Sequence, residues 1–535
     1  MQDKDNKRVA LLILDGWGLS PSWGGNAINM NNPKNINRLW RSYPHKILRA
    51  YDRSISKTGY IGNSEIGHTA ISAGRFIKPN FDYINDRILD GSFYENQSLK
   101  LSIENCKKHN SSLHLIGMVS DAGIHSHINH LYALLKLAKK AEIHKVFIHM
   151  ITDGRDTTAT EALIYLNKLL DQIKKIGVGE VASVTGRYFA MDKINKWDRI
   201  SLAYKAIALA TGDRGLDPRH VITKAYEKGY TDEYIPPTVI YDSGRPVAKI
   251  EDFDSLIFFN YRSDRMQELV SVFMNKKRVV WNGPRLYNLH ITTFSDYFYH
   301  QFYKGYRVAF KRENIEPNIA QIISNLGSKQ IHIAESEKSS HVSFFFDGGR
   351  LEPYPNEDWL IIPSLNIYDY AKRPEMSAAK ISKAVEKSMT NKNYNFIVAN
   401  IANVDILGHS GNITATAKAV AEVDRCVGEI AEASLENNVS LIVTADHGNA
   451  EQMVRVGSMA TDDEIIHTIN PVPFILVDKE FRYKNEKNEL SNNNMLSDIL
   501  KSDGTLADIA PTILDLMSLD IPNEMSGTSL IGRME

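Results

Sequence analysis

Short, unbroken apolar runs that end in charged loops recur along the whole chain. The first is Val9–Leu14, which stops at Asp15. Such runs are typical of strands buried on both faces of a parallel sheet, and segments of helical periodicity separate them. This alternation of strand, loop and helix predicts an α/β fold with parallel sheets. In open sheets of this kind the chemistry lies in the loops after the carboxyl ends of the strands.

The outer segments of the chain carry acidic and imidazole side chains in these loops. The apolar runs 9–14, 395–401 and 439–444 are each followed by such a loop, and a further histidine lies in Ile466-His467-Thr468. The resulting candidate metal ligands are Asp15, Asp405, His409, Asp446, His447 and His467.

The composition of this set favours two metal ions. Asp405 and His409 are four residues apart, so they could share one face of a helical turn. Carboxylate and imidazole without sulfur suit Mn²⁺ or Zn²⁺ better than Ca²⁺ or Mg²⁺. Six ligands are too many for one zinc-like ion with an open position, whereas paired ions can clamp the oxygens of a phosphoryl transfer. Each residue alone is more often a turn, cap or structural residue, and only the joint occurrence favours a metal site.

Ser64 is the candidate nucleophile. It follows Gly62-Asn63 and begins a predicted helix over 64–73. A helix N-terminus has unpaired N–H groups and a partial positive charge, which suit a phosphate or an ionised hydroxyl. A metal ion can lower the pKa of such a hydroxyl without a histidine relay. The alternative is an ordinary serine N-cap, which this stretch alone would favour.

The middle of the chain has strand ends of a different kind. The apolar run 113–119 ends in a loop that contains His125, and the runs 146–151, 181–184 and 257–260 end in loops that contain arginine. Guanidinium groups suit carboxylate and phosphate, so four of them at equivalent strand ends indicate an anionic small molecule, although a single one is usually a surface ion pair. The candidate residues are His125, Arg155, Asp156, Arg187, Arg262 and Arg265.

Composition excludes several classes of protein. The chain has 535 residues, so two domains are the default expectation. A net charge of −1 gives no global field for nucleic acid or membrane. Two cysteines, Cys106 and Cys426, exclude a disulfide framework and a thiolate metal site. No apolar stretch reaches the ~18 residues of a membrane span, so we expect a cytoplasmic protein.

Seven motifs of the chain form a recognisable set. They are Asp15-Gly16-Trp17-Gly18, Asn63-Ser64-Glu65-Ile66-Gly67-His68, Ser120–His127, Asp153-Gly154-Arg155-Asp156, Gly186-Arg187-Tyr188, Asn403–His409 and Asp446-His447-Gly448-Asn449. Together they resemble the cofactor-independent (2,3-bisphosphoglycerate-independent) phosphoglycerate mutases of the alkaline phosphatase superfamily, from about residue 8 to 533. The resemblance implies an alkaline-phosphatase-like parallel-sheet domain over 1–78 and 312–535, with a second α/β domain, the transferase domain, inserted over 79–311.

The resemblance also implies a site and a reaction. One metal ion, usually Mn²⁺, would be held by Asp405, His409 and His467, and a second by Asp15, Ser64, Asp446 and His447. Ser64 would take the phosphoryl group of 3-phosphoglycerate and return it to the other hydroxyl of glycerate, giving 2-phosphoglycerate in glycolysis and gluconeogenesis. Asp156 would carry the proton and Lys338 would stabilise the phosphoryl charge. His125, Arg155, Asp156, Arg187, Arg262 and Arg265 would hold the glycerate, and the enzyme would be a monomer.

Two departures from the family pattern stand out. Met191-Asp192 is followed by Lys193 where the family usually has arginine, so the fork of that cation is lost. The polar segment Lys479–Asp503 is longer than expected, and we interpret it as a dispensable surface insertion. Because the metal ligands and the arginines come from different segments, we also expect the domains to close on the substrate, with hinges near Phe76–Asn80 and Val308–Pro317.

Two other functions share part of this pattern. A metal-dependent phosphatase or sulfatase of the same superfamily would use the same ligands without the arginine-rich segment. A non-enzymatic phosphate-binding protein would not need a serine at the metal ions.

Overall fold

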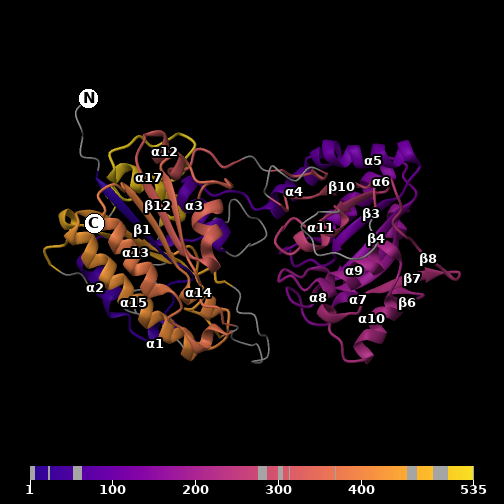
Figure 1. Ribbon diagram of the computed structural model, residues 1–535, viewed down its shortest axis with the longest axis horizontal. Helices are drawn as coiled ribbons and strands as arrows, with labels where there is room; N and C mark the ends of the chain where they lie inside the picture. Colours follow the sequence, from indigo (N-terminus) through magenta and orange to yellow (C-terminus); the bar gives the residue numbers. More distant parts are fainter. Residues whose placement is uncertain are drawn as a thin grey trace. The chain divides into compact units, whose positions relative to one another are not determined.

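The computed structural model describes residues 7–21, 25–51, 63–274, 286–298, 305–311, 314–367, 369–454, 467–485 and 504–533. The chain divides into two compact units, of which unit 1 comprises Met1–Lys78 with Glu313–Glu535 and unit 2 comprises Pro79–Arg312 (Figure 1). Both units contain a mostly parallel sheet with helices, so the predicted α/β class is confirmed.

Unit 1 is built on a sheet in which eight strands pair within the described residues, in the order β13-β12-β14-β1-β15-β16-β2-β17. The central strand β1 is parallel to both of its neighbours, β14 and β15. Only β16 runs antiparallel to the strands beside it. The strands are β1 (Arg8–Leu14), β2 (His45–Arg49), β12 (Gln330–Glu335), β13 (Glu357–Ile362), β14 (Phe396–Ile401), β15 (Val439–Thr444), β16 (Val472–Val477) and β17 (Gly504–Thr505).

Helices of unit 1 form two groups around this sheet (Figure 1). In one group α15 contacts α13, α2 and α1, and in the other α3 contacts α12, α17 and the π-helical segment His341–Phe345. Apolar side chains of both groups and of the sheet share one buried core. The helices are α1 (Ala27–Met30), α2 (Lys34–Ser42), α3 (Ser64–Ala73), α12 (Ile319–Asn325), α13 (Ala378–Thr390), α14 (Asn403–Gly408), α15 (Ile413–Glu436) and α17 (Ile509–Leu516).

Unit 2 has its own sheet, in which the described strands follow the order β11-β10-β9-β3-β4-β5-β7-β6, with β8 paired to β7. The chain runs outward from β3 through β4 to β5 and later returns to the other side of β3 with β9. The strand order therefore reverses beside β3, which is where open α/β sheets place their ligands. The strands are β3 (Leu113–Met118), β4 (Val146–Thr152), β5 (Glu180–Gly186), β6 (Asp213–Gly215), β7 (Thr238–Asp242), β8 (Arg245–Pro246), β9 (Ser255–Phe258), β10 (His290–Thr293) and β11 (Arg307–Val308).

Helices α4 to α11 belong to unit 2, and several of them pack a separate apolar core against its sheet. They are α4 (Asn80–Leu89), α5 (Gln97–His109), α6 (Ile128–Lys140), α7 (Ala162–Ile176), α8 (Arg187–Ala190), α9 (Trp197–Leu209), α10 (Pro218–Glu227) and α11 (Gln267–Phe273). Across both units, no described helix is long and apolar enough to span a membrane.

The polar segment Lys479–Asp503 is described only as far as residue 485. Its first residues form the short 3-10 helix Lys479–Phe481, and Tyr483 N–H donates a hydrogen bond to the Ser42 carbonyl at 2.9 Å. The beginning of this segment therefore packs on unit 1, and the remainder, 486–503, lies outside the described residues.

Candidate active site

Three neighbouring strands of unit 1 bring its acidic side chains to one edge of the sheet. Asp15 follows β1, Asp446 follows β15, and Asp405 lies on α14 directly after β14. Parallel strands end at the same edge, so side chains from widely separated parts of the chain meet there. All three carboxylates are buried, at 0–2% exposure.

Ser64 is the first residue of α3, but it does not cap that helix. The Asn63 side chain accepts the Ile66 N–H at 2.9 Å and provides the cap. The Ser64 hydroxyl is thereby left for the site, where its Oγ lies 3.2 Å from Asp15 Oδ1 and 2.9 Å from His447 Nε2. The interpretation of Ser64 as an ordinary N-cap is therefore wrong.

Lys338 joins the serine to the carboxylates. Its ammonium nitrogen lies 2.7 Å from Ser64 Oγ, from Asp15 Oδ1 and from Asp405 Oδ2. Burial opposes the charge of this lysine, but the surrounding aspartates raise its pKa above the usual range. Burial, together with the charge of Asp446, raises the pKa of Asp15 to about 6.

His409 and His467 complete the acidic cluster at its outer side. Their Nε2 atoms lie 3.3 Å and 3.2 Å from Asp405 Oδ1. The two Nε2 atoms are 2.9 Å apart, and the His467 ring stacks on that of His447 with centroids 3.8 Å apart. All the predicted metal ligands therefore lie in one cluster.

The donor atoms of this cluster fit divalent metal ions. Ligand atoms of Asp405, His409 and His467 lie within 4.8 Å of one another, and so do those of Asp15, Asp405 and His447. A further set combines Asp15, His68 and Asp446. Oxygen and imidazole donors at this spacing, without sulfur, suit divalent ions of the zinc or manganese type.

Two residues of the site were missing from the candidates predicted from the sequence. The Asn400 amide donates to Asp15 Oδ2 at 2.7 Å and lies 3.0 Å from His68 Nε2. The other ring nitrogen of His68 faces the Ser64 carbonyl at 2.8 Å and Asp446 Oδ2 at 3.2 Å. Asn400 and His68 thus connect the carboxylates of Asp15 and Asp446. The signal available in the sequence was a polar residue, Asn400, near the end of an apolar strand.

Unit 2 gathers its predicted residues at the ends of β3, β4, β5 and β9. Arg187, at the start of α8, donates to Asp153 at 2.6 Å and to Asp156 at 2.7 Å, and its second terminal nitrogen lies 3.0 Å from His125 Nε2. Asp153 was not among the predicted site residues. It is buried, accepts hydrogen bonds from the backbone of Arg155 and Asp156, and so shapes this loop.

Positive charge surrounds His125 on several sides. Burial and the charges of Arg262, Arg187, Arg265 and Lys193 hold the pKa of His125 well below its usual range, so the ring is neutral. Burial, together with the charge of Asp153, raises the pKa of Asp156 although Arg187 opposes this. The arrangement is a cation-rich site with one buried carboxyl group of raised proton affinity.

The outer cations of this site are more accessible than Arg187. The side chains of Arg155, Arg262 and Lys193 are 38%, 42% and 50% exposed, and each forms an ion pair of 3.3–4.0 Å with an acidic neighbour. Arg265 is closer to the interior, where burial and the charges of other arginines lower its pKa.

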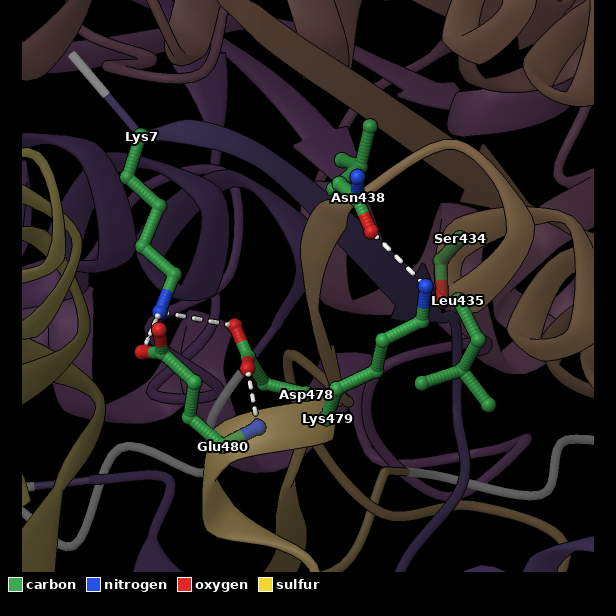
Figure 2. Close-up of a pocket in the computed structure, with 8 residues that line it drawn as sticks. Lys7, Ser434, Leu435, Asn438, Asp478, Lys479 and Glu480 are labelled. Carbon is green, nitrogen blue, oxygen red and sulfur yellow. Dashed lines mark hydrogen bonds and ion pairs between the residues drawn. The ribbon is translucent and has the colours of Figure 1, made fainter. Parts of the chain in front are cut away.

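A hollow at the opposite end of the unit 1 sheet has no comparable chemistry. Figure 2 shows Lys7 paired with Asp478 and Glu480, and Lys479 bonded to Asn438, so its charged groups already have partners. It lies where β1 and β15 begin, whereas the candidate site lies where they end.

Two family models match separate parts of the chain. The model described as the BPG-independent PGAM N-terminus matches residues 84–298. The model described as type I phosphodiesterase / nucleotide pyrophosphatase matches residues 367–532. The first match falls within unit 2 and the second within unit 1.

Curated relatives match over nearly their whole length. A 2,3-bisphosphoglycerate-independent phosphoglycerate mutase of Acetivibrio thermocellus is 40% identical over 534 residues, covering 98% of this chain and 99% of the relative. One of Clostridium perfringens is 39% identical over 530 residues with the same coverage. A crystal structure of Leishmania mexicana phosphoglycerate mutase at low cobalt concentration shares the fold, with a TM-score of 0.78 at 23% identity over 99% of this chain and 98% of that one. The resemblance of the motifs is confirmed, and the chain belongs to the family of 2,3-bisphosphoglycerate-independent phosphoglycerate mutases.

Proposed function

We propose that this chain interconverts 3-phosphoglycerate and 2-phosphoglycerate through a phosphoserine at Ser64, with two bound divalent ions that are Mn²⁺ or a similar metal. The observation that carries the proposal is the position of Ser64 Oγ, which is released from helix capping and lies among Asp15, His447 and Lys338. Family membership points to the same reaction. We further propose that the enzyme works as a cytoplasmic monomer.

The residues that would hold the metal ions fall into two groups. Asp405, His409 and His467 would hold one ion, and Asp15, Ser64, Asp446 and His447 the other. Divalent ions at these positions lower the pKa of the Ser64 hydroxyl and offset the charge of the phosphoryl oxygens. Asn400 and His68 keep the carboxylates in place, as partners of metal ligands commonly do.

The bonds and protons of the reaction can be followed through Ser64 and Asp156. Ionised Ser64 Oγ attacks phosphorus, and the bond from phosphorus to the 3-oxygen of glycerate breaks. Asp156, whose pKa is raised by burial, would give that oxygen a proton. The 2-hydroxyl then returns a proton to Asp156 and attacks phosphorus, which restores ionised Ser64. Lys338, bonded to Ser64 Oγ, offsets charge on the transferred group.

Binding of glycerate falls to the cations of unit 2. Arg262, Arg265, Arg155 and Lys193 provide charge for the carboxylate of the substrate. Arg187, which is already paired with Asp153 and Asp156, positions the proton carrier and neutral His125. Glycerate held in this way stays bound between the two transfers, and this distinguishes a mutase from a phosphatase or a sulfatase.

The experiment that tests the proposal is a mutase assay with 3-phosphoglycerate and Mn²⁺, in which 2-phosphoglycerate and free phosphate are followed together. We expect 2-phosphoglycerate to form without added bisphosphoglycerate and in large excess over free phosphate. Ser64→Ala should lose several orders of magnitude in rate while it retains the fold, because covalent catalysis has no substitute.

Ser72→Ala is the matched control, since Ser72 is a buried serine on the same helix whose hydroxyl has no hydrogen-bond partner among the described residues. It should keep most of the activity. Free phosphate as the main product would identify a phosphatase instead, and substantial mutase activity of Ser64→Ala would contradict the phosphoserine.

A further inference from the structure

A second group of buried acidic and imidazole side chains lies outside the active site of unit 1. His332 is in the middle of β12, Glu357 begins β13, and Asp347 follows the π-helical segment His341–Phe345. Their ligand atoms lie within 4.8 Å of one another, and the side chains are 0–6% exposed. Glu357 pairs in register with Gln330, the first residue of β12, so the group lies at the other end of these strands from Lys338.

Both ring nitrogens of His332 face oxygen acceptors. The Gln330 amide nitrogen donates to the Ala320 carbonyl at 2.7 Å, so its oxygen is the atom that faces His332 Nε2 at 3.3 Å. The Val342 carbonyl oxygen faces Nδ1 at 2.7 Å, and a neutral ring has a hydrogen for only one of its two nitrogens. When Nε2 carries the hydrogen, Nδ1 has only a lone pair.

Three oxygen atoms converge on that lone pair. The Val342 carbonyl oxygen is 2.7 Å from His332 Nδ1, Glu357 Oε1 is 3.1 Å away, and Asp347 Oδ1 is 3.6 Å away. Acceptors facing a lone pair repel one another unless a positive charge lies between them.

Asp347 gives the second, independent indication of a ligand. The residue is wholly buried, and neither of its carboxylate oxygens accepts a hydrogen bond from the residues that the structure describes. The nearby donors are already used, because Trp359 Nε1 and Tyr354 N both donate to Glu357. An uncompensated buried carboxylate is strongly unfavourable.

The separations fit a metal ion. Ligands bound tetrahedrally at ~2.0–2.2 Å lie ~3.3–3.6 Å from one another, and the two edges from His332 Nδ1 are 3.1 Å and 3.6 Å. His332 Nε2 donating to Gln330 is the usual partner arrangement of a metal-bound histidine. The rings of Phe346 and Phe396 lie against His332 and exclude water. The Val342 oxygen would move slightly outward to become the fourth ligand.

We propose that His332, Asp347 and Glu357 bind a structural divalent ion of the zinc or manganese class in the core of unit 1. This ion links β12, β13 and the segment after the π-helix. It takes no part in phosphoryl transfer, so the proposal stands independently of the mutase reaction.

The test compares the metal content of native full-length variants purified with Zn²⁺ and Mn²⁺ and then dialysed against EDTA. Asp347→Asn and Glu357→Gln keep the volume of each side chain but remove its charge. Each should lose one metal equivalent relative to the wild-type chain and unfold at a lower temperature. Glu335→Gln, a buried carboxylate at the end of the same strand whose Oε2 accepts from Ser364, is the control and should keep the ion.

Measuring two variants keeps the test decisive if one of them folds poorly. An unchanged metal content in either folded variant overturns the proposal. In that case a protonated cluster supplies the positive charge, and Asp347→Asn should then be as stable as the wild-type chain or more so.

Discussion

At the scale of single residues, two adjacent side chains have different roles, helix capping and a place at the metal ligands, and the sequence alone could not tell which residue has which role. Asn63 caps α3 and Ser64 faces the metal ligands, although both residue types are good N-caps. Only the direction of each side chain decides between the two, and that direction depends on how α3 packs, with Gly67 against Asp446. Most of the metal ligands could be predicted because they follow apolar runs. Asn400 is a polar residue near the end of such a run, and its role depends on which side chains the neighbouring strands bring to it.

Arg187 shows the same limit of sequence reasoning in unit 2. The loop after β5 predicted a guanidinium at an anion site, and the structure places Arg187 there but pairs it with Asp153 and Asp156. A charge in a loop indicates a site, but the partner of that charge comes from another strand. Its role therefore depends on strand order, which the sequence does not state.

Asn400 provides a prediction at this scale. Asn400→Ala removes the donor to Asp15 Oδ2 and the contact with His68. Because partners of metal ligands typically contribute a factor of ~10–100 to affinity, we expect Mn²⁺ to bind the metal-free variant more weakly by about this factor. Calorimetric titration of Mn²⁺ measures the change.

Ser440→Ala is the control for Asn400→Ala. Ser440 is buried on β15 and bonds to Asp478, at the end of the sheet away from the metal ligands. Its loss should lower stability without changing Mn²⁺ affinity. Equal affinity in Asn400→Ala and the wild-type chain would show that Asn400 does not support the site.

At the scale of elements, the strands formed by the longer apolar runs were predictable, but the secondary structure of the short apolar run 342–346 was not. Runs such as 113–119 and 439–444 became β3 and β15 because each lies between two other strands. The run 342–346 lies largely within a π-helix, His341–Phe345. Periodicity alone cannot separate a buried strand from a buried helical turn in so few residues.

Helix α3 approaches the end of β15 so closely that Gly67 has no room for a side chain. A Cβ atom at Gly67 would lie 2.5 Å from the Asp446 carbonyl oxygen. Gly67→Ala would gain ~1 kcal/mol from helix propensity, but overpacking against backbone costs ~1–3 kcal/mol. We expect a net loss of stability and a displaced Asp446 with reduced activity. Urea unfolding and the mutase assay measure both effects, and a more stable, fully active variant would contradict this packing argument.

At the scale of the whole molecule, each unit has an apolar core of its own. The fold class followed from the alternation of strands and helices. The order of the strands did not follow from this alternation, because every order of parallel strands has the same sequence pattern.

Separate cores predict separate unfolding transitions. Metal ions that bind only unit 1 should raise the free energy of unfolding of that unit alone, by ~2.7 kcal/mol for each ion when Mn²⁺ is 100 times its dissociation constant. Scanning calorimetry with Mn²⁺ and with EDTA should therefore shift one transition and leave the other in place. Leu169→Ala, in the core of unit 2, should lower the temperature of only the transition that does not change with metal. A single transition that responds to both changes would show that the units unfold together.

The central position of β1 has a consequence for how the protein is made. β1 precedes unit 2 in the chain, yet its neighbours β14 and β15 follow only after unit 2 has been synthesised. At ~5–20 residues per second, the roughly 400 intervening residues take ~20–80 s. Throughout that time a strand that is apolar on both faces has no partner, while the inserted unit can already complete its sheet. The nascent chain of this enzyme should therefore depend on chaperone protection of its first strand, and ribosome profiling of chaperone-bound chains should show that protection ending once β15 has emerged.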